Sequence, residues 1–345
     1  MNICEQNRNI DYISFLQSFA VTLVVIGHCM LRFNGEIPPN WSTIIHDIIY
    51  SFHMPLFFVL AGFLLMNSFH RQSRTVQNIA NFINNKFVRL IIPYFTIGSL
   101  AYMLKVFIFN KFAFKPASLD IMFYIKSMLI PSENPNRFLW FLPTLFLIFI
   151  FAYLVLNKDN YKRVHLVSWM ILSFILSFLS HYMHIRWFNL DISRILYHLF
   201  YFFFGALFFD IKDKVLEILS NRGVLLFIIL LFAEMQVIPL FQYNFVNYIF
   251  DYIVAILGIL ISISLAKCCC NYNHKFLWGI CDGKFYQIYL LSWFFQSGIR
   301  ILYQTGIVNY ITVCFLMLIA SFLFPILITN VIKSYFPKLK VFIGL

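Results

Sequence analysis

Ten apolar stretches, each close in length to a membrane-spanning helix, constrain this sequence more than any other feature. A helix needs about 20 apolar residues to cross the hydrocarbon core of a bilayer. The ten stretches cover residues 13–33, 44–66, 90–109, 138–156, 164–181, 194–210, 223–241, 246–267, 284–302 and 308–332. Only 12% of the 345 residues are charged, about half the share in a soluble domain. The sequence therefore predicts an all-α polytopic membrane protein with about ten transmembrane helices.

The distribution of Lys and Arg predicts how these helices are oriented. With the N-terminus in the cytoplasm, 17 of the 26 basic residues fall on the cytoplasmic side and nine on the other side. This bias and the even number of helices predict two cytoplasmic termini. The amphipathic stretch 117–130 is too short to span and is expected to lie at the membrane interface. No polar domain or long linker intervenes, so residues 1–345 are predicted to form a single domain.

Charge and cysteine usage argue against two classes of partner. The net charge of +12 comes from basic residues spread over loops, which favours contact with anionic lipid headgroups over nucleic-acid binding. The seven cysteines form no CxxC pair and no zinc-type spacing with histidine, so no metal site is predicted. For the run Cys268–Cys270, free thiols are favoured over a lipidation or metal site.

The N-terminal segment MNICEQNRNI is too polar for a signal peptide, so the first stretch is expected to remain a helix.

Two histidines lie within the first two apolar stretches, which is costly unless they have partners or a role. His28 lies about five residues from the outer end of its helix and His53 about nine, so their depths differ by only about 6 Å. The short connection 34–43, with Pro38 and Pro39, makes the two helices antiparallel neighbours. Both imidazoles can therefore share one cavity, although the sequence does not fix the rotation of either helix.

Polar side chains form a stripe on the first helix. Gln17 precedes His28 by 11 positions, and 11 residues at about 100° each return to within about 20° of the starting direction, about 16 Å along the axis. Ser14, Ser18 and Thr22 are further polar residues of this helix. The stripe is either the wall of a passage or a set of hydrogen bonds to neighbouring helices, and the sequence favours neither.

The second helix contains a proline and a glycine with structural consequences. Pro55 lies two residues after His53 and frees the carbonyl of Ser51. It therefore predicts a kinked helix that borders a cavity. Gly62 predicts the close approach of a neighbouring helix.

Other charged residues lie at or within the apolar stretches. Lys86 and Arg89, three residues apart at the cytoplasmic start of the third helix, are expected to share one helical face. They are either a positive-inside anchor or a phosphate-binding pair at the mouth of a pocket. Glu234, Asp251 and Arg300 are expected to face the bundle interior. There they either form structural ion pairs, with Arg194 as a further partner, or line a sugar pocket.

The order of these motifs resembles the membrane-bound acyltransferase 3 family, whose members are bacterial O-acetyltransferases. Within it the chain is most similar to the fucose 4-O-acetylase-like branch. The matching segments are Gly27-His28, Tyr50–Phe63 (YSFHMPLFFVLAGF), Lys86–Tyr94 (KFVRLIIPY) and Trp140-Phe141-Leu142. The resemblance spans the chain, and the first 95 residues are its specific part.

The resemblance implies an O-acyltransferase of the bacterial inner membrane. Acetyl-CoA or another acyl-CoA would be the co-substrate, with its phosphates on Lys86 and Arg89, and no cofactor would be tightly bound. His28 would be the general base or a transient acyl carrier, and His53 would orient His28 or the acceptor. The acceptor would be a hydroxyl of a cell-envelope glycan, an exported glycan or a lipid-linked sugar. The candidate acceptor pocket contains Trp140, Glu234, Asp251 and Arg300.

Two positions depart from the family pattern. Gln17 stands where the family usually has Arg or Lys as the companion of the histidine, and Ser292 stands where the late segment Ile288–Ser292 often ends in His. These departures leave open an altered substrate, a weakened enzyme or a loss of catalysis. A transporter or flippase of a glycan or lipid-linked sugar is the alternative function, because a kinked helical bundle with a polar stripe also suits transport.

Overall fold

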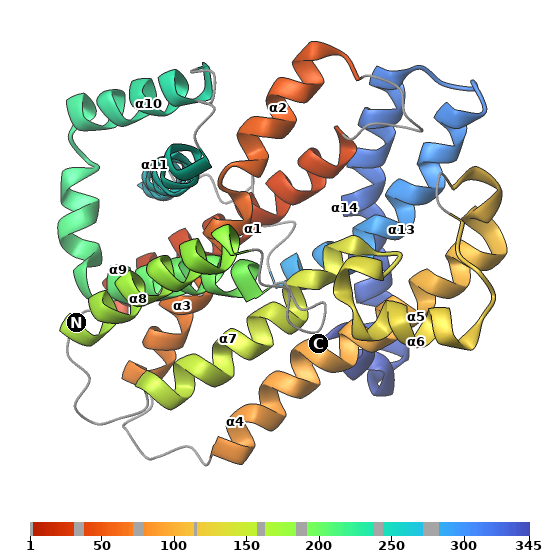
Figure 1. The fold of residues 1–345 in the computed structure, drawn as a ribbon, viewed down its shortest axis with the longest axis horizontal. Coiled ribbons are helices and arrows are strands. Elements are labelled where there is room, and N and C mark those ends of the chain that lie inside the picture. Colours follow the sequence, from red (N-terminus) through yellow and green to blue (C-terminus); the bar gives the residue numbers. More distant parts are fainter. Residues whose placement is uncertain are drawn as a thin grey trace.

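The computed structural model describes residues 3–30, 38–71, 79–113, 116–156, 163–183, 192–237, 244–271 and 283–345. Every regular element in these ranges is a helix (Figure 1). Eight helical segments among them are long and apolar enough to cross a membrane. The predicted all-α polytopic membrane fold is therefore confirmed.

The α-helices follow the expected apolar stretches. In chain order they are α1 (Ile3–Cys29), α2 (Asn40–Tyr50), α3 (His53–Arg71), α4 (Ile79–Lys86), α5 (Ile92–Leu104), α6 (Ile121–Leu129), α7 (Phe141–Leu156), α8 (Arg163–Tyr182), α9 (Ile192–Ile218), α10 (Arg222–Val237), α11 (Asn244–Asn271), α13 (Phe285–Gln304) and α14 (Tyr310–Tyr335). Short π-helical or 3₁₀ segments are η1 (Phe87–Ile91), η2 (Lys105–Phe109), η3 (Asn110–Phe112), η4 (Pro131–Glu133), η5 (Arg137–Trp140) and η6 (Pro337–Ile343).

Eight of the ten expected spans have a counterpart that is apolar enough to cross a membrane. These segments are Tyr12–Cys29, Asn40–His70, Ile79–Phe112, Arg137–Leu156, Arg163–Tyr182, Ile192–Ile218, Val246–Cys270 and Tyr310–Tyr335. The expected spans 223–241 and 284–302 correspond to α10 and α13. α10 has only 16 residues, and α13 carries three buried polar side chains besides its arginine. The count of ten spans and the cytoplasmic position of the termini stay predictions.

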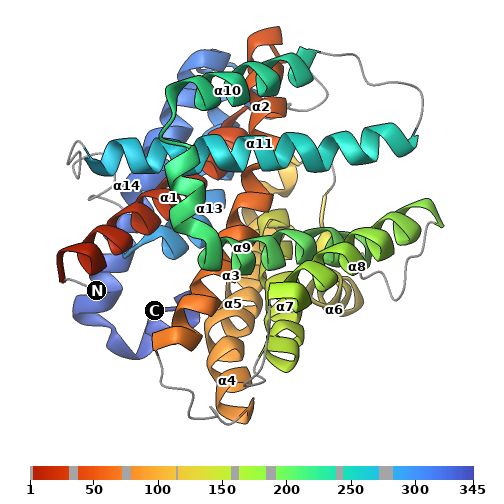
Figure 2. The same cartoon turned by 90° about the vertical axis from the view of Figure 1, so that its left-hand side faces the viewer.

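α1 lies at the middle of the bundle. It contacts α3 and α11 on one side and α13 and α14 on the other. α8, α9 and α3 pack side by side in one part of the molecule, whereas α13 and α14 form a pair in the other (Figure 1). Figure 2 shows α11 lengthwise, with α10 beside it. The end of α1, which carries the candidate histidine, is therefore surrounded by helices from both parts of the chain.

Glycines allow α3 and α9 to touch along their backbones. A Cβ atom added at Gly62 would lie 1.9 Å from the carbonyl oxygen of Phe202, and one at Gly205 would lie 2.0 Å from that of Val59. No larger residue fits at either position without separating the helices. The close approach expected at Gly62 is confirmed, and its partner is α9.

The second expected span is divided into two helices. α2 ends at Tyr50 and α3 begins at His53, so the kink expected near Pro55 is a break at residues 51–52. The restart places Pro55 in the first turn of α3, where a missing backbone N–H costs no hydrogen bond. The first of the two helices begins at Asn40, four residues earlier than expected. Residues 34–37 of the expected connection lie outside the described ranges.

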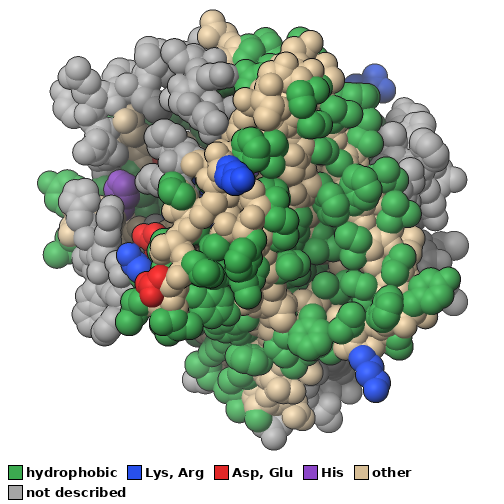
Figure 3. All heavy atoms as spheres, turned by 90° about the vertical axis from the view of Figure 1, so that its right-hand side faces the viewer, with side chains coloured by type: hydrophobic (Ala, Val, Ile, Leu, Met, Phe, Trp, Pro, Cys, Tyr) green, Lys and Arg blue, Asp and Glu red, His purple; other side chains and the backbone are tan. Residues whose placement is uncertain are grey.

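Apolar side chains cover much of the described outer surface. In Figure 3, hydrophobic side chains dominate the visible face and charged ones are few and scattered. Exposed apolar residues on α5 and α14 include Leu100, Met103, Ile311, Phe315 and Leu323. This surface suits contact with lipid. The helix expected within 117–130 is present as α6, while its place at a membrane interface stays a prediction.

Candidate active site

His28, near the end of α1, lies between two aromatic side chains. Its imidazole stacks on Phe138 of η5, with ring centroids 3.6 Å apart and 19° between the ring planes. The hydroxyl of Tyr50, the last residue of α2, lies 3.0 Å from Nδ1 of His28. His28 as a residue is half-buried. The two aromatic neighbours therefore fix the orientation of the ring.

Gly27 makes room for the tyrosine that contacts His28. A Cβ atom at Gly27 would lie 2.9 Å from Cε2 of Tyr50. A larger residue would push the Tyr50 ring away from α1 and its hydroxyl away from the imidazole. The Gly27-His28 pair thus acts as a unit, because the glycine admits the hydrogen-bond partner of the histidine.

His53 begins α3 and is buried. Its Nδ1 lies 2.8 Å from the carbonyl oxygen of Ile49 and must donate, because a carbonyl oxygen only accepts. Carbonyl groups at the end of a helix lack some of the backbone donors that they would have within it. The imidazole N–H of His53 supplies a donor to the Ile49 carbonyl oxygen at the end of α2. The ring of Tyr50 lies 4.7 Å from that of His53. The structure therefore brings both His28 and His53 next to Tyr50, as the matched depths suggested.

Arg300 of α13 belongs to the surroundings of His28. It interacts electrostatically with His28 and with Cys29 and Cys314. The sequence grouped Arg300 with Asp251 in an acceptor pocket. Asp251 of α11 lines a pocket whose described lining residues do not include Arg300.

The late segment that ends at Ser292 supports the same site from α13. The hydroxyl of Tyr289 donates to the carbonyl oxygen of Phe138 and so holds the ring on which His28 stacks. Ser292 is buried, and its hydroxyl lies 3.4 Å from the carbonyl oxygen of Tyr289 within the same helix. The serine at this position therefore packs inside the bundle next to the tyrosine that anchors Phe138.

Gln17 precedes His28 by 11 residues on α1 and is partly accessible. Among the residues that the structure describes, no hydrogen-bond partner occurs for its side chain, whereas Thr22 donates to the carbonyl oxygen of Ser18 at 2.8 Å. The polar stripe therefore has two kinds of member. Thr22 bonds within its own helix, and Gln17 leaves its amide available.

Lys86 and Arg89 lie at a transition from α-helix to π-helix. Lys86 ends α4, and its ammonium lies 3.8 Å from the ring centroid of Phe149, while Arg89 lies on η1 and is exposed. The wider π-helical turn means that the two residues do not follow the α-helical spacing from which a shared face was expected. They still interact electrostatically, and the hydroxyl of Tyr286 fixes the Arg89 carbonyl oxygen at 2.7 Å.

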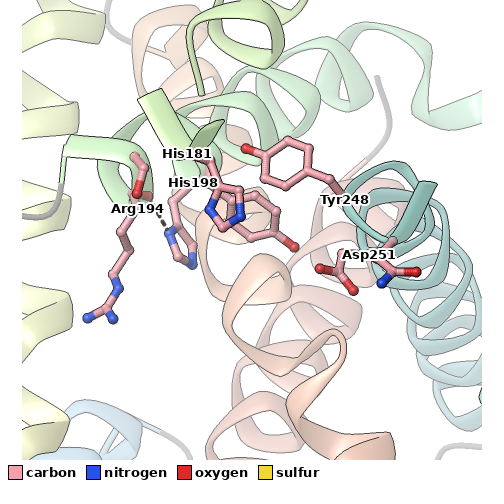
Figure 4. A pocket seen from close by; sticks show the side chains of 8 residues that line it. His181, Arg194, His198, Tyr248 and Asp251 are labelled. Carbon is pink, nitrogen blue, oxygen red and sulfur yellow. Dashed lines mark hydrogen bonds between the residues drawn. The ribbon is translucent and has the colours of Figure 1, made fainter. Parts of the chain in front are cut away.

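A second polar region lies between α8, α9 and α11. It is a pocket of about 410 Å³, and Figure 4 shows its lining side chains. The lining residues are His181 of α8, Ser193, Arg194, Tyr197 and His198 of α9, and Asn247, Tyr248 and Asp251 of α11. In Figure 4 the carboxylate of Asp251 lies across the pocket from His181 and His198. Positive, negative and neutral polar groups thus line one cavity.

Trp140 connects this pocket to the surroundings of His28. The guanidinium of Arg194 lies 4.8 Å from the ring centroid of Trp140, and the His198 ring lies 5.2 Å from it. Trp140 belongs to η5, the same four-residue segment that carries Phe138. Trp140 therefore contacts two residues that line the pocket, Arg194 and His198, without lining it itself. The expectation that Trp140 and Asp251 take part in one acceptor region stays a prediction.

Glu234 does not reach this pocket. It is exposed on α10 and is not one of the eight lining residues of the described chain. The structure also describes no group of three or more His, Cys, Asp or Glu side chains placed to hold a metal ion. Cys268–Cys270 lie at the end of α11 and form no disulfide within the described residues. The preference for free thiols over a lipidation or metal site stays a prediction.

Sequence reasoning missed several members of the two regions. Tyr50 lies inside the segment Tyr50–Phe63 and Phe138 begins the apolar stretch 138–156, but no spacing rule connects either of them to His28. His181 and His198 lie in apolar stretches at membrane depth, the same signal that singled out His28 and His53. That signal could have found them.

Comparison with known proteins identifies the family of the chain. The profile of the acyltransferase domain of the acyltransferase 3 family matches residues 10–330. No curated protein and no solved structure matches the chain. The match extends over most of the chain and includes both the His28 region and the polar pocket. The chain therefore belongs to the acyltransferase 3 family of membrane acyltransferases.

Proposed function

We propose that this membrane acyltransferase moves an acetyl or similar acyl group from acyl-CoA to a hydroxyl of a cell-envelope or exported glycan at the bacterial inner membrane. The observation that carries the proposal is the environment of His28. Tyr50 and Phe138 fix the orientation of the imidazole, while Arg300 supplies a positive charge nearby. This combination of an oriented base and a cation is what acyl transfer to an alcohol requires.

His28 acts as the general base in this proposal. When Nδ1 of His28 donates to the hydroxyl oxygen of Tyr50, Nε2 carries the lone pair. Nε2 takes the proton of the acceptor hydroxyl as its oxygen attacks the thioester carbonyl. The carbon–sulfur bond then breaks, and the proton passes from His28 to the departing CoA thiolate.

Arg300 stabilises the negative charge on the carbonyl oxygen during this attack. A fixed cation in a site with little water favours the tetrahedral intermediate more than the neutral thioester. The assignment rests on the packing of α13 on α1, where Gln296, one turn before Arg300, donates to the carbonyl oxygen of Val25. Arg300 also interacts electrostatically with His28. The assignment moves Arg300 from the acceptor pocket to the reaction centre.

The donor is held by Lys86 and Arg89. CoA carries several phosphate charges, which an exposed guanidinium binds through paired N–H donors. Arg89 has an exposed side chain on a backbone that Tyr286 fixes. Lys86 lies against an aromatic ring beside it and adds a second positive charge. On the predicted topology this pair faces the cytoplasm, where acyl-CoA is available.

Assays on the purified protein in lipid nanodiscs test the proposal. With acetyl-CoA labelled in the acetyl group and a lipid-linked or soluble glycan, we expect free CoA thiol and labelled glycan in equal amounts. A rapid quench with cold organic solvent near neutral pH, before the glycan is added, distinguishes the two roles of His28, because only an acyl carrier would retain label on the protein. Acid is avoided because an acyl-imidazole hydrolyses quickly in it. Absence of thioester turnover, together with movement of labelled sugar across vesicles, would instead support a transporter or flippase.

A further inference from the structure

We infer that the pocket between α8, α9 and α11 binds one sugar unit of the acceptor glycan at a subsite adjacent to the reacting unit. That a sugar binds is inferred from the pocket alone. That this sugar belongs to the acceptor glycan rests on the proposed function. The inference predicts that the protein recognises at least two linked sugar units.

The lining matches a neutral polyhydroxyl ligand. Asp251 only accepts hydrogen bonds, Arg194 only donates, and Asn247 does both. A sugar ring presents hydroxyls that donate and accept around its edge, so it can use all three kinds of partner. A simple anion would face the Asp251 carboxylate, and a simple cation would face the Arg194 guanidinium, so neither suits this pocket.

Aromatic rings complete the match. Tyr197 and Tyr248 line the pocket, and their rings offer apolar surface to the C–H groups of a sugar. The volume of about 410 Å³ lies within the ordinary range for small-ligand sites. The pocket therefore has room for a sugar unit and both polar and apolar groups to orient it.

The geometry of η5 separates this subsite from the reaction centre. Phe138 stacks on His28, while Trp140, two residues later, contacts Arg194 and His198. A 3₁₀ helix has three residues per turn, so side chains two positions apart point about 120° from each other. His28 and the pocket thus lie against different sides of one segment. A sugar in the pocket is not the unit whose hydroxyl meets His28 but a neighbouring one.

Asp251→Asn is the test variant. Asp251 is exposed to the pocket, so the substitution changes charge and hydrogen bonding without removing a buried core side chain. Glu217→Gln on α9 is the matched control, because Glu217 is an exposed carboxylate outside the pocket. Binding of glucose, galactose, fucose and N-acetylglucosamine, and of disaccharides made from them, is measured by tryptophan fluorescence. Acyl transfer to the same sugars is measured in parallel.

We expect at least one of these sugars to bind to the wild-type protein and to the Glu217→Gln variant. Asp251→Asn should weaken that binding about 10- to 100-fold, the effect of losing a hydrogen bond to a charged group. KM for a disaccharide acceptor should rise by a similar factor, while kcat and the KM for acyl-CoA stay the same. KM for a monosaccharide acceptor should not change, because a single unit at His28 does not reach the pocket.

The outcomes for the subsite and for the proposed function are distinguishable. If none of these sugars binds, or if Asp251→Asn binds them as tightly as the wild type, the subsite is wrong. If the sugars bind through Asp251 but acetyl-CoA is never consumed, the subsite stands and the proposed function is wrong. An equal effect of Asp251→Asn on mono- and disaccharide acceptors would contradict the adjacent position.

Discussion

The His28 region and the polar pocket are built on opposite principles. His28 is surrounded mainly by aromatic rings, and among the described residues one hydroxyl, that of Tyr50, lies within hydrogen-bond distance of its ring nitrogens. The pocket gathers acidic, basic, amide and hydroxyl groups on three helices around an open volume. The first arrangement restricts one imidazole to one orientation, and the second offers many hydrogen-bond partners to a ligand. In the proposed function, the His28 region carries out the reaction and the pocket recognises the acceptor.

The two regions also differ in how the chain assembles them. The His28 region takes residues from the ends of α1 and α2, from η5 and from α13, whereas the pocket takes its residues from α8, α9 and α11. Substitutions there should affect kcat, because small displacements of a base or a cation cost catalysis. Substitutions in the pocket should affect the acceptor KM. The variants below test this division from the largest expected effect to the smallest.

Arg300→Gln should have the largest effect of these variants. Loss of one group that stabilises the oxyanion lowers the turnover rate about 100- to 1,000-fold. Arg300→Lys keeps the charge and should retain part of the activity, which separates the electrostatic role from packing. Steady-state kinetics with Arg222→Gln, an exposed arginine on α10, provides the control. A change in acceptor KM alone would return Arg300 to a binding role.

Tyr50→Phe should lower the turnover rate about 10- to 100-fold with little change in either KM. The hydroxyl that orients His28 is lost while the ring remains, and a hydrogen bond to a group that becomes charged has about this value. Gly27→Ala should act in the same direction, since the new methyl group pushes the Tyr50 ring away. Tyr335→Phe is the control, because Tyr335 is exposed. Unaltered turnover in both variants would show that the orientation of His28 does not depend on Tyr50.

Arg89→Gln should raise the KM for acyl-CoA about tenfold, because one charge-assisted hydrogen bond to phosphate is lost. The KM for the glycan should not change. Lys333→Gln, which removes an exposed positive charge from α14, controls for general electrostatic attraction of CoA. An equal rise in the KM for acyl-CoA in both variants would show that Arg89 acts only as part of the positive-inside anchor.

Gln17→Arg should have the smallest effect, a decrease of about threefold in the KM for acyl-CoA. The change restores the basic residue that the family resemblance implies at this position. Residue 17 lies on the same face of α1 as His28 but about 16 Å away along the helix axis. An accessible charge at that distance contributes less than about 1 kcal/mol. The measurement is the acyl-CoA KM of Gln17→Arg beside that of Gln17→Asn. If Gln17→Arg instead turned over about 100-fold faster, the gain expected from a catalytic group, the native chain would be a weakened enzyme.

The general architecture could be predicted from the sequence because it depends on local composition. Membrane-length apolar runs identified eight segments, and Gly62 correctly indicated a close helix contact. Pro55 indicated an interruption, and the structure places it at residues 51–52, before the proline. Next to this break the imidazole of His53 donates to the carbonyl oxygen of Ile49. A proline shows that a helix is interrupted nearby but not at which residue.

The membership of the two regions could be predicted only in part. His28 and Asp251 were recognised because a polar residue at membrane depth needs a partner. Arg300 met the same criterion but does not line the pocket that contains Asp251, since the sequence does not say which helices pack together. Phe138 carries no polar atom in its side chain, so only the structure shows that it stacks on His28.

Chemical rescue of His28→Ala tests the central claim most directly. The variant removes the base and leaves space beside Phe138 and Tyr50. We expect the rate of acetyl transfer to fall by about 100- to 10,000-fold and to recover in part when imidazole is added, with His70→Ala, an exposed histidine on α3, unaffected. Wild-type activity in His28→Ala, with the amount of folded protein unchanged, would contradict the assignment of His28 as the base.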